Sequence, residues 1–253
     1  HSDILLAKAL KGRDIGIATK VGVRWDTGHA ISDLSANHLR SDVEASLRRL
    51  GRDHIDLLQV HWPCDANTPF EESFGVLDAL VKEGHIRYLG VCNYPADALK
   101  SIRQITPIVS LQTPYSMLRR EFEATLMPAC KALDLSSLAY EPLCRGLLTG
   151  KYSQRPHFAE SDLRSRDERF SGPGFFHAQR ILNDLKRVAT RVQAPLSALS
   201  LGWALQRCDF VIAGAKRPEQ IIENASAYQL IDREKIGSVI DRILAIHGGV
   251  PRI

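Results

Sequence analysis

The sequence predicts an α/β protein, a (β/α)8 TIM barrel of which six of the eight strands can be read in this chain. Six short apolar runs alternate with segments whose apolar residues recur every three or four positions, as in amphipathic helices. Each run ends on or beside a polar residue, and a parallel sheet carries its chemistry at the carboxyl ends of its strands. The length of 253 residues also suits one barrel.

The first half of the chain alternates regularly between the two kinds of element. Apolar runs predict strands at Gly16–Lys20, Ile55–Val60, Leu89–Asn93 and Val109–Gln112. Helical periodicity predicts helices at Ser2–Lys11, up to Leu50, at Glu71–Glu83, from Pro95 onward and at Glu121–Leu133. Gly12, Gly51 and Gly84 lie just past three of these helices, where a glycine commonly ends a helix. The segment 21–35, which contains Trp25, is expected to be a loop.

The alternation is interrupted in the second half. A strand is expected within Ser136–Leu143, but Cys144–Phe176 is rich in Gly, Pro, Arg and Ser and predicts one long loop. A loop of this length exceeds a simple connection, so we expect it to be functional. The remaining elements are helices at Ala178–Val192 and Leu196–Gln206, a strand at Phe210–Lys216, and helices at Pro218–Tyr228 and Asp232–Ile246.

Composition excludes several classes of function. Hydrophobic residues are 44% and charged residues 25%, and the net charge of +4 is spread along the chain, which gives no basis for binding nucleic acid. No apolar run reaches the length of a membrane helix, and no leader-like segment opens the chain. The nine histidines show no metal-ligand spacing, and neither a GxGxxG nor a P-loop motif is present. We therefore expect a small-molecule protein without a metal, a membrane or a nucleic-acid partner, and the sequence leaves its oligomeric state open.

The cysteines indicate the compartment. They are odd in number, scattered and without a CxxC pair, and they lie at Cys64, Cys92, Cys130, Cys144 and Cys208. This pattern favours free thiols in a reducing compartment, so a cytoplasmic location is expected.

The strand count leads to an expectation about the whole protein. No domain boundary is visible, so residues 1–253 are interpreted as a single barrel domain. Six parallel strands would leave two unpaired edges and an open core. We therefore expect two further strand–helix units before His1, and without them neither a closed barrel nor efficient turnover.

Several strings, in order, resemble the aldo-keto reductase family. They are HSDILLAKAL, IATK, SLRRLGRDHIDLLQVHWP, GHIRYLGVCNYP, SLQTPYS, AYEPLCRGLLTGKY and IAGAKRPEQIIENASA. The resemblance implies an eight-stranded barrel that binds a nicotinamide cofactor, usually NADPH, and reduces aldehydes and ketones to alcohols. It also implies a tyrosine acid, a lysine that lowers the pKa of that tyrosine, an aspartate beside the lysine, and a histidine that orients the carbonyl.

The motifs assign the catalytic residues in part. Lys20 of IATK matches the family's lysine, and His61 of VHWP matches its histidine. Taken alone, Lys20 could be a solvated strand end and His61 a core histidine. The aspartate and tyrosine belong to a motif that comes before the family's counterpart of HSDILLAKAL. The proton donor is therefore expected before His1.

The resemblance also assigns cofactor contacts. Asn93 and Gln112 match the residues that hold the nicotinamide carboxamide, Cys92 stands where the family usually has serine, and Tyr140 matches the tyrosine that stacks on the ring. The pyrophosphate loop corresponds to Glu141, Leu143, Arg145 and Gly146, and the adenosine end to Ala215, Lys216, Arg217, Gln220, Glu223 and Asn224. Two cations before a helix suit a 2′-phosphate, which favours NADPH over NADH.

The substrate is expected to be a small carbonyl compound that the sequence does not name. Aromatic residues following the strands, Trp25, Trp62 and Tyr94, are the predicted walls of its pocket, with Phe175 and Phe176 nearby. Two alternatives remain at this point. One is an NADPH-binding barrel that acts mainly as a regulatory or partner subunit, and the other is an unrelated barrel enzyme such as a phosphate-handling lyase.

Overall fold

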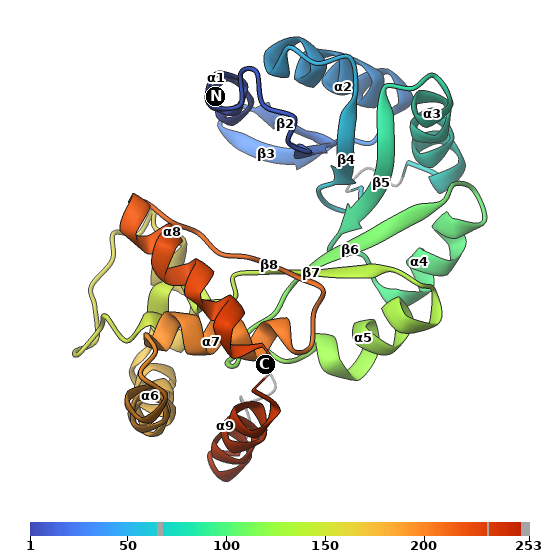
Figure 1. Cartoon of the computed structure of the whole chain (residues 1–253). Helices are drawn as coiled ribbons and strands as arrows, with labels where there is room; N and C mark the ends of the chain where they lie inside the picture. Colours follow the sequence, from blue (N-terminus) through green and yellow to red (C-terminus); the bar gives the residue numbers. More distant parts are fainter. Residues whose placement is uncertain (65–67, 232, 249–253) are drawn as a thin grey trace. The chain divides into compact units, whose positions relative to one another are not determined.

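The structure is a computed structural model that describes residues 1–64, 68–231 and 233–248. The described residues form two compact units along the chain (Figure 1). The first unit comprises His1–Gln112 and Thr125–Ser137, and the second comprises Thr113–Ala124 and Leu138–Ile253.

The first unit is a parallel sheet with helices between its strands. Its strands are β1 (Ala18–Val21), β4 (Ile55–Val60), β5 (Ile86–Cys92) and β6 (Ile108–Pro114), hydrogen-bonded in that order and all parallel. Its helices are α1 (Ser2–Ala9), α2 (Ala36–Leu50), α3 (Phe70–Lys82), α4 (Ala96–Arg103) and most of α5 (Phe122–Ala132). The four strands and five helices predicted for this half of the chain are confirmed to within a few residues.

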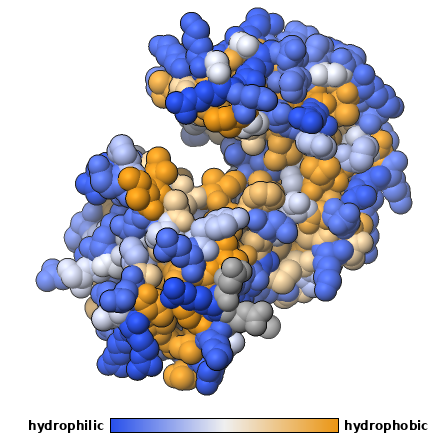
Figure 2. All heavy atoms as spheres, viewed as in Figure 1, coloured by the Kyte–Doolittle hydropathy of each residue, from blue (hydrophilic) through white to orange (hydrophobic). Residues whose placement is uncertain are grey.

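Amphipathic helices cover one face of this sheet (Figure 1). In α2, Leu39, Val43 and Leu47 are buried along one stripe, and the surface over α2 in Figure 2 is mostly hydrophilic. Val60 and Val91 pair in register and are fully buried. Burial of each such side chain stabilises the folded state by about 1.5–3 kcal/mol. This burial favours one orientation of each strand, in which the alternate residues face away from the helices.

The opposite face of the sheet carries the polar residues. Side chains alternate between faces along a strand, and residues paired in register share a face. Lys20 pairs with Gln59, Gln59 with Gly90, and Gly90 with Ser110, so these four form one row across β1, β4, β5 and β6. A Cβ on Gly90 would lie 2.2 Å from Ser110 Oγ. Glycine therefore lets the buried side chains of Gln59 and Ser110 approach each other within this row.

A β-hairpin occupies the segment that the sequence analysis assigned to a loop. β2 (Val23–Asp26) pairs with β3 (His29–Ser32) in antiparallel fashion. The two residues between them, Thr27 and Gly28, both have positive φ, at 45° and 86°, as a two-residue turn matched to the twist of a hairpin requires. The loop assignment of residues 21–35 was wrong because these strands are only four residues long and mostly exposed.

The second unit contains the end of β6, most of β7 (Ser136–Tyr140), and β8 (Phe210–Ile212). Tyr115 N–H, just after β6, donates to Tyr140 O at 3.1 Å, and β7 pairs with β8 in parallel. The helical elements are η1 (Cys144–Thr149), η2 (Leu163–Arg166), η3 (Glu168–Phe170), α6 (Gly172–Val192), α7 (Leu196–Leu205), α8 (Pro218–Ala225), η4 (Ser226–Leu230) and α9 (Glu234–Ile246).

Several predicted boundaries in this unit were wrong. β8 ends at Ile212 rather than Lys216, because Ile212 pairs with Tyr140 and β7 ends there as Glu141 takes a left-handed φ of 53°. The predicted loop 144–176 contains three short 3-10 helices and the first turn of α6, which begins at Gly172. The predicted helix end at Tyr228 falls in η4, and the predicted helix start at Asp232 lies outside the described residues.

Candidate active site

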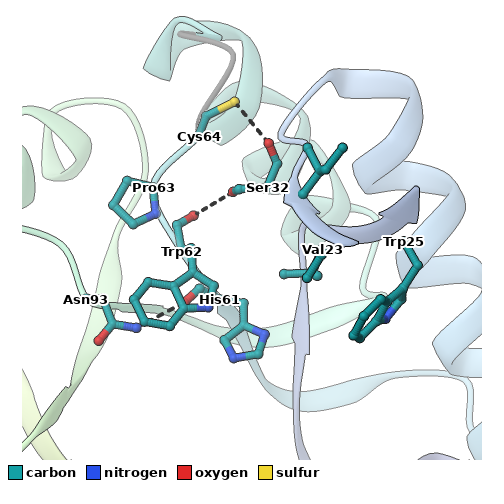
Figure 3. A pocket seen from close by; sticks show the side chains of 10 residues that line it. Val23, Trp25, Ser32, His61, Trp62, Pro63, Cys64 and Asn93 are labelled. Carbon is teal, nitrogen blue, oxygen red and sulfur yellow. Dashed lines mark hydrogen bonds between the residues drawn. The ribbon is translucent and has the colours of Figure 1, made fainter. Parts of the chain in front are cut away.

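The polar residues predicted in the first unit gather at the carboxyl ends of its strands. Lys20 is the third residue of β1, His61 directly follows β4, Asn93 directly follows β5, and Gln112 lies in β6. His61 and Asn93 line one open pocket of about 770 Å³ together with Trp25 and Trp62 (Figure 3). The structure thus brings His61 and Asn93 to one pocket, whose lining does not include Lys20 or Gln112.

Backbone hydrogen bonds between neighbouring strands fix these side chains. His61 N–H donates to Val21 O at 3.0 Å, and Asn93 N–H donates to Gln112 O at 2.9 Å. Asn93 has a left-handed φ of 64°, and its Nδ2 donates to His61 O at 3.3 Å (Figure 3). Asparagine tolerates this backbone conformation better than most residues. The turn after β5 is therefore joined directly to the residue that follows β4.

Lys20 and His61 are coupled electrostatically. Partial burial lowers the pKa of His61 below its ordinary value of 6.5, and the positive charge of Lys20 lowers that pKa further. The imidazole is therefore neutral at pH 7. A neutral imidazole offers one N–H donor and one acceptor nitrogen, which suits a residue that binds a carbonyl oxygen.

The lowered pKa of His61 gives a testable dependence of stability on pH. Because the unfolded chain binds this proton more readily than the folded one, stability from this group is fully present above pH 6.5 and is lost as pH falls through the lower folded pKa. Between pH 7.5 and a pH below the folded pKa of His61, the free energy of unfolding should fall less in His61→Gln than in wild type. Urea unfolding at several pH values measures it, with His29→Gln, an exposed histidine on β3, as the control. An identical pH dependence in wild type and His61→Gln would contradict the assignment.

Cys92 and Gln112 pair in register, on the same face of the sheet as Gly90 and Ser110. Burial raises the pKa of the Cys92 thiol to about 12, and the charge of Lys20 opposes this rise only in part. Gln112 is 5% exposed, and its Oε1 has no hydrogen-bond partner among the described residues. An amide oxygen buried without a partner is costly, so Gln112 fits a role in receiving a donor from a bound molecule.

The three aromatic residues predicted to wall the substrate pocket are placed differently. Trp25 and Trp62 line it from opposite sides, and they are 75% and 45% exposed (Figure 3). Tyr94 does not line it, because its ring is buried against Phe70 and Phe74. The hydroxyl of Tyr94 donates to Trp62 O at 3.5 Å, and burial raises its pKa. Tyr94 therefore supports the turn that carries Trp62. Phe175 is buried and Phe176 exposed, both in α6.

The second unit has its own pocket, of about 650 Å³, at the carboxyl ends of β7 and β8. Seven predicted cofactor residues line it: Glu141, Leu143, Arg145, Gly146, Ala215, Lys216 and Gln220. Four residues in the segment after β7 have a left-handed backbone: Glu141, Cys144, Arg145 and Gly146. Non-glycine residues held in this conformation are strained and gather at functional sites, which supports a binding role for this segment.

Arg145 and Gln220 already have partners in the pocket of the second unit. The Nε of Arg145 donates to Glu141 Oε1 at 2.8 Å, and its Nη1 donates to Leu163 O at 3.0 Å. Gln220 Oε1 accepts the Lys216 backbone N–H at 2.7 Å, which satisfies a donor just before α8. Arg145 thus links the left-handed segment to η2, and fewer of its N–H donors remain to bind a ligand.

Four predicted cofactor residues of the second unit do not line this pocket. Tyr140 ends β7, Arg217 is exposed directly before α8, Asn224 is half-buried on α8, and Glu223 Oε1 accepts a short hydrogen bond from the Ser197 hydroxyl. Four polar residues that were not predicted do line it: Thr149, Lys151, Asp162 and Arg164. The basic, glycine-containing string Thr149-Gly150-Lys151 in the long loop was the available signal.

The described residues show neither a metal centre nor a membrane-spanning helix. No cluster of three or more His, Cys, Asp or Glu side chains there is arranged to hold a metal ion. No helix in the described ranges combines the length and the apolar character needed to cross a membrane.

Comparison with known proteins decides the family. The profile of the Aldo/keto reductase family matches residues 1–242. The chain belongs to this family. The aldo-keto reductase YhdN of Bacillus subtilis (strain 168) is 35% identical over 228 residues, which cover 87% of this chain and 69% of that protein. The NADH-specific methylglyoxal reductase of Escherichia coli (strain K12) is 30% identical, with 91% of this chain and 75% of that protein covered.

A solved structure agrees with this membership. The glycerol dehydrogenase AKR11B4 from Gluconobacter oxydans superposes with a TM-score of 0.93 at 31% identity, covering all of this chain and 80% of that one. The predicted α/β class with its barrel strands is confirmed. Membership makes this aldo-keto reductase an NAD(P)-dependent oxidoreductase that acts on carbonyl compounds.

Proposed function

We propose that this protein reduces small aldehydes or ketones with NADPH, and that Lys20 and His61 are the catalytic residues of this chain. The observation that carries the proposal is the neutral His61 at the mouth of the tryptophan-lined pocket, under the charge of Lys20. The described cysteines remain thiols, four of them buried, which supports the further proposal of a reducing, cytoplasmic location. We also propose that residues 1–253 belong to one barrel domain.

The proposed roles follow from where charge develops. Carbonyl reduction places negative charge on the carbonyl oxygen, and donors positioned there lower the barrier. The neutral imidazole of His61 donates one N–H to that oxygen and so orients the carbonyl. Lys20 contributes a fixed positive charge beside it. Trp25 and Trp62 offer apolar walls against which the substrate can pack.

The residues that would hold the nicotinamide cofactor divide by unit. In the first unit, Asn93 and Gln112, whose Oε1 has no hydrogen-bond partner in the described ranges, fit the donor and acceptor of a carboxamide. In the second, Lys151 and Lys216 give the pocket positive charge suited to phosphates. When bound, NADPH supplies the hydride. We assign the proton donor to neither Tyr94 nor Tyr115, since the Tyr115 hydroxyl donates to Glu123 Oε1 at 2.6 Å and the Tyr94 hydroxyl to Trp62 O.

Cofactor preference is expected to depend on the two cations before α8. Lys216→Gln/Arg217→Gln should weaken NADPH binding by roughly 10–150-fold per charged hydrogen bond lost, and NADH binding far less. Fluorescence titration with both cofactors measures this, and Arg191→Gln, an exposed arginine of α6, is a control for net charge. Equal losses for NADPH and NADH would show that these cations do not recognise a 2′-phosphate.

The proposed function is tested by titration and turnover on the natural full-length polypeptide. NADPH fluorescence should saturate, and nicotinamide absorbance should fall when methylglyoxal is added, the substrate named for the Escherichia coli relative. Saturable NADPH binding without oxidation by any of a panel of aldehydes and ketones would contradict the enzymatic role. Preference for NADH with normal turnover would contradict only the cofactor assignment.

A further inference from the structure

The first unit has a second pocket, at the amino-terminal end of its strands. It has a volume of about 480 Å³ and lies where α1 and α2 end and the chain enters β1 and β4. Its charged lining is entirely basic: Lys11, Arg13, Arg48, Arg49 and Arg52. Lys20 and His61 lie at the other end of the same two strands, so this pocket is separate from the candidate active site.

Two similar loops build this pocket. One runs Leu10-Lys11-Gly12-Arg13-Asp14 and the other Leu50-Gly51-Arg52-Asp53. In each the glycine is left-handed, with φ of 74° at Gly12 and 65° at Gly51. An Nη2 of Arg52 donates to Arg13 O at 3.1 Å and joins the two loops. The aspartate of neither loop lines the pocket, and Asp53 contacts His54 Nδ1 at 2.8 Å.

The cations of this pocket exceed their local counter-charges. Arg49 pairs with Asp3 at 2.9 Å, and Arg48 lies 3.8 Å from Glu44 in an exposed contact that contributes little. Within the described residues, Lys11 and Arg13 form no ion pair. The carboxyl ends of α1 and α2 each contribute about half a negative charge. After these negative charges are subtracted, about three of the five positive charges around the pocket remain uncompensated. Like charges held close together favour a bound counter-anion.

We propose that this basic pocket is a binding site for a small diphosphate-type anion. Arginine presents a rigid fork of N–H donors that matches phosphate oxygens, and a ligand with several negative charges engages several guanidinium groups at once. The diphosphate can come from the inorganic ion or from the end of a nucleotide. This site is independent of carbonyl reduction and of the cofactor pocket in the second unit.

The test is a titration followed residue by residue. Nitrogen-15-labelled protein is titrated with inorganic diphosphate and, separately, with ADP, at constant ionic strength against chloride. The backbone amides of Gly12 and Gly51 should shift with a Kd of about 1 mM or lower. Lys11→Gln/Arg13→Gln should raise that Kd at least about tenfold. Lys100→Gln/Arg191→Gln, which removes two exposed cations elsewhere, should leave it unchanged.

The outcomes separate this site from the proposed function. Amides of Gly146 and Gly214 report the pocket of the second unit, so shifts there alone would overturn the proposal while leaving the cofactor assignment intact. A lack of shifts at Gly12 and Gly51 would also overturn the proposal. So would a control variant that loses as much affinity for diphosphate as Lys11→Gln/Arg13→Gln. Equal affinity for the two probes identifies the phosphates as the recognised group, and tighter ADP binding identifies a nucleotide. Arg48→Gln provides a second variant if Lys11→Gln/Arg13→Gln unfolds.

Discussion

Lys20→Met should lower kcat/KM for carbonyl reduction by roughly 10²–10⁴-fold, the range for a positioned group that assists proton transfer. Methionine keeps the length and apolar stem of this half-buried side chain but removes its charge. The same variant should raise the pKa of His61 toward its ordinary value, because the charge of Lys20 helps to lower it. Steady-state kinetics and an NMR titration of His61 measure the two effects.

The kinetic and NMR measurements distinguish loss of the Lys20 charge from loss of the folded structure. A misfolded Lys20→Met variant would lose activity and also the tertiary NMR signals, whereas the expected variant keeps them. Lys100→Met, at an exposed site of α4, serves as the matched control and should retain wild-type kinetics. Activity of Lys20→Met within about threefold of wild type would remove Lys20 from the catalytic assignment.

Gly90→Ala should lower the free energy of unfolding by about 1–3 kcal/mol, the usual effect of overpacking a core. The added Cβ would lie 2.2 Å from Ser110 Oγ and 3.2 Å from Ser110 O, so β5 and β6 must shift apart. Urea denaturation measures the change. Gly75→Ala is a matched control, since among the described residues nothing except its chain neighbours and the backbone of α3 lies within 4 Å of its Cβ position. This variant should be neutral or stabilise by about 0.5–1 kcal/mol.

A second substitution identifies the cause of this destabilisation. Ser110→Ala removes the buried Oγ, which has no partner among the described residues. The double variant Gly90→Ala/Ser110→Ala should therefore recover much of the lost stability. A Gly90→Ala protein as stable as wild type, or a double variant no better than the single one, would mean that this row of side chains is not closely packed.

The strands and the strand-end residues of the first unit could be predicted because their signals are local. Apolar runs bounded by polar residues specify each strand, and the polar residue after it marks the carboxyl end. The register that aligns Lys20 with Gln59, Gly90 and Ser110 could not be predicted, because pairing depends on how whole strands are packed by α2 to α4. The hairpin β2–β3 was missed because its strands are short and exposed, although Thr27-Gly28 suits its turn.

The pocket of the second unit was predictable only in part. Motif resemblance located Arg145 and Lys216, but Lys151 and Arg164 come from a long loop without periodicity. The hydrogen bonds of Arg145 to Glu141 and to Leu163 O depend on how that loop folds back, which short-range sequence patterns do not encode. Tyr94 was misplaced for a related reason, since an aromatic residue after a strand can turn either into the pocket or into the core.

The buried cysteine thiols can report on local unfolding, because a reagent reaches them only when the surrounding structure opens. Because burial holds the pKa of Cys92 near 12, that sulfur stays protonated and is a poor nucleophile in the folded protein. Alkylating reagents should therefore reach Cys64, which is half-buried, well before Cys92. Cys92 and Cys130 lie in the first unit, and Cys144 and Cys208 lie in the second. The order in which these four sulfurs acquire a label under mild denaturant would reveal whether the two units open as one cooperative body or separately.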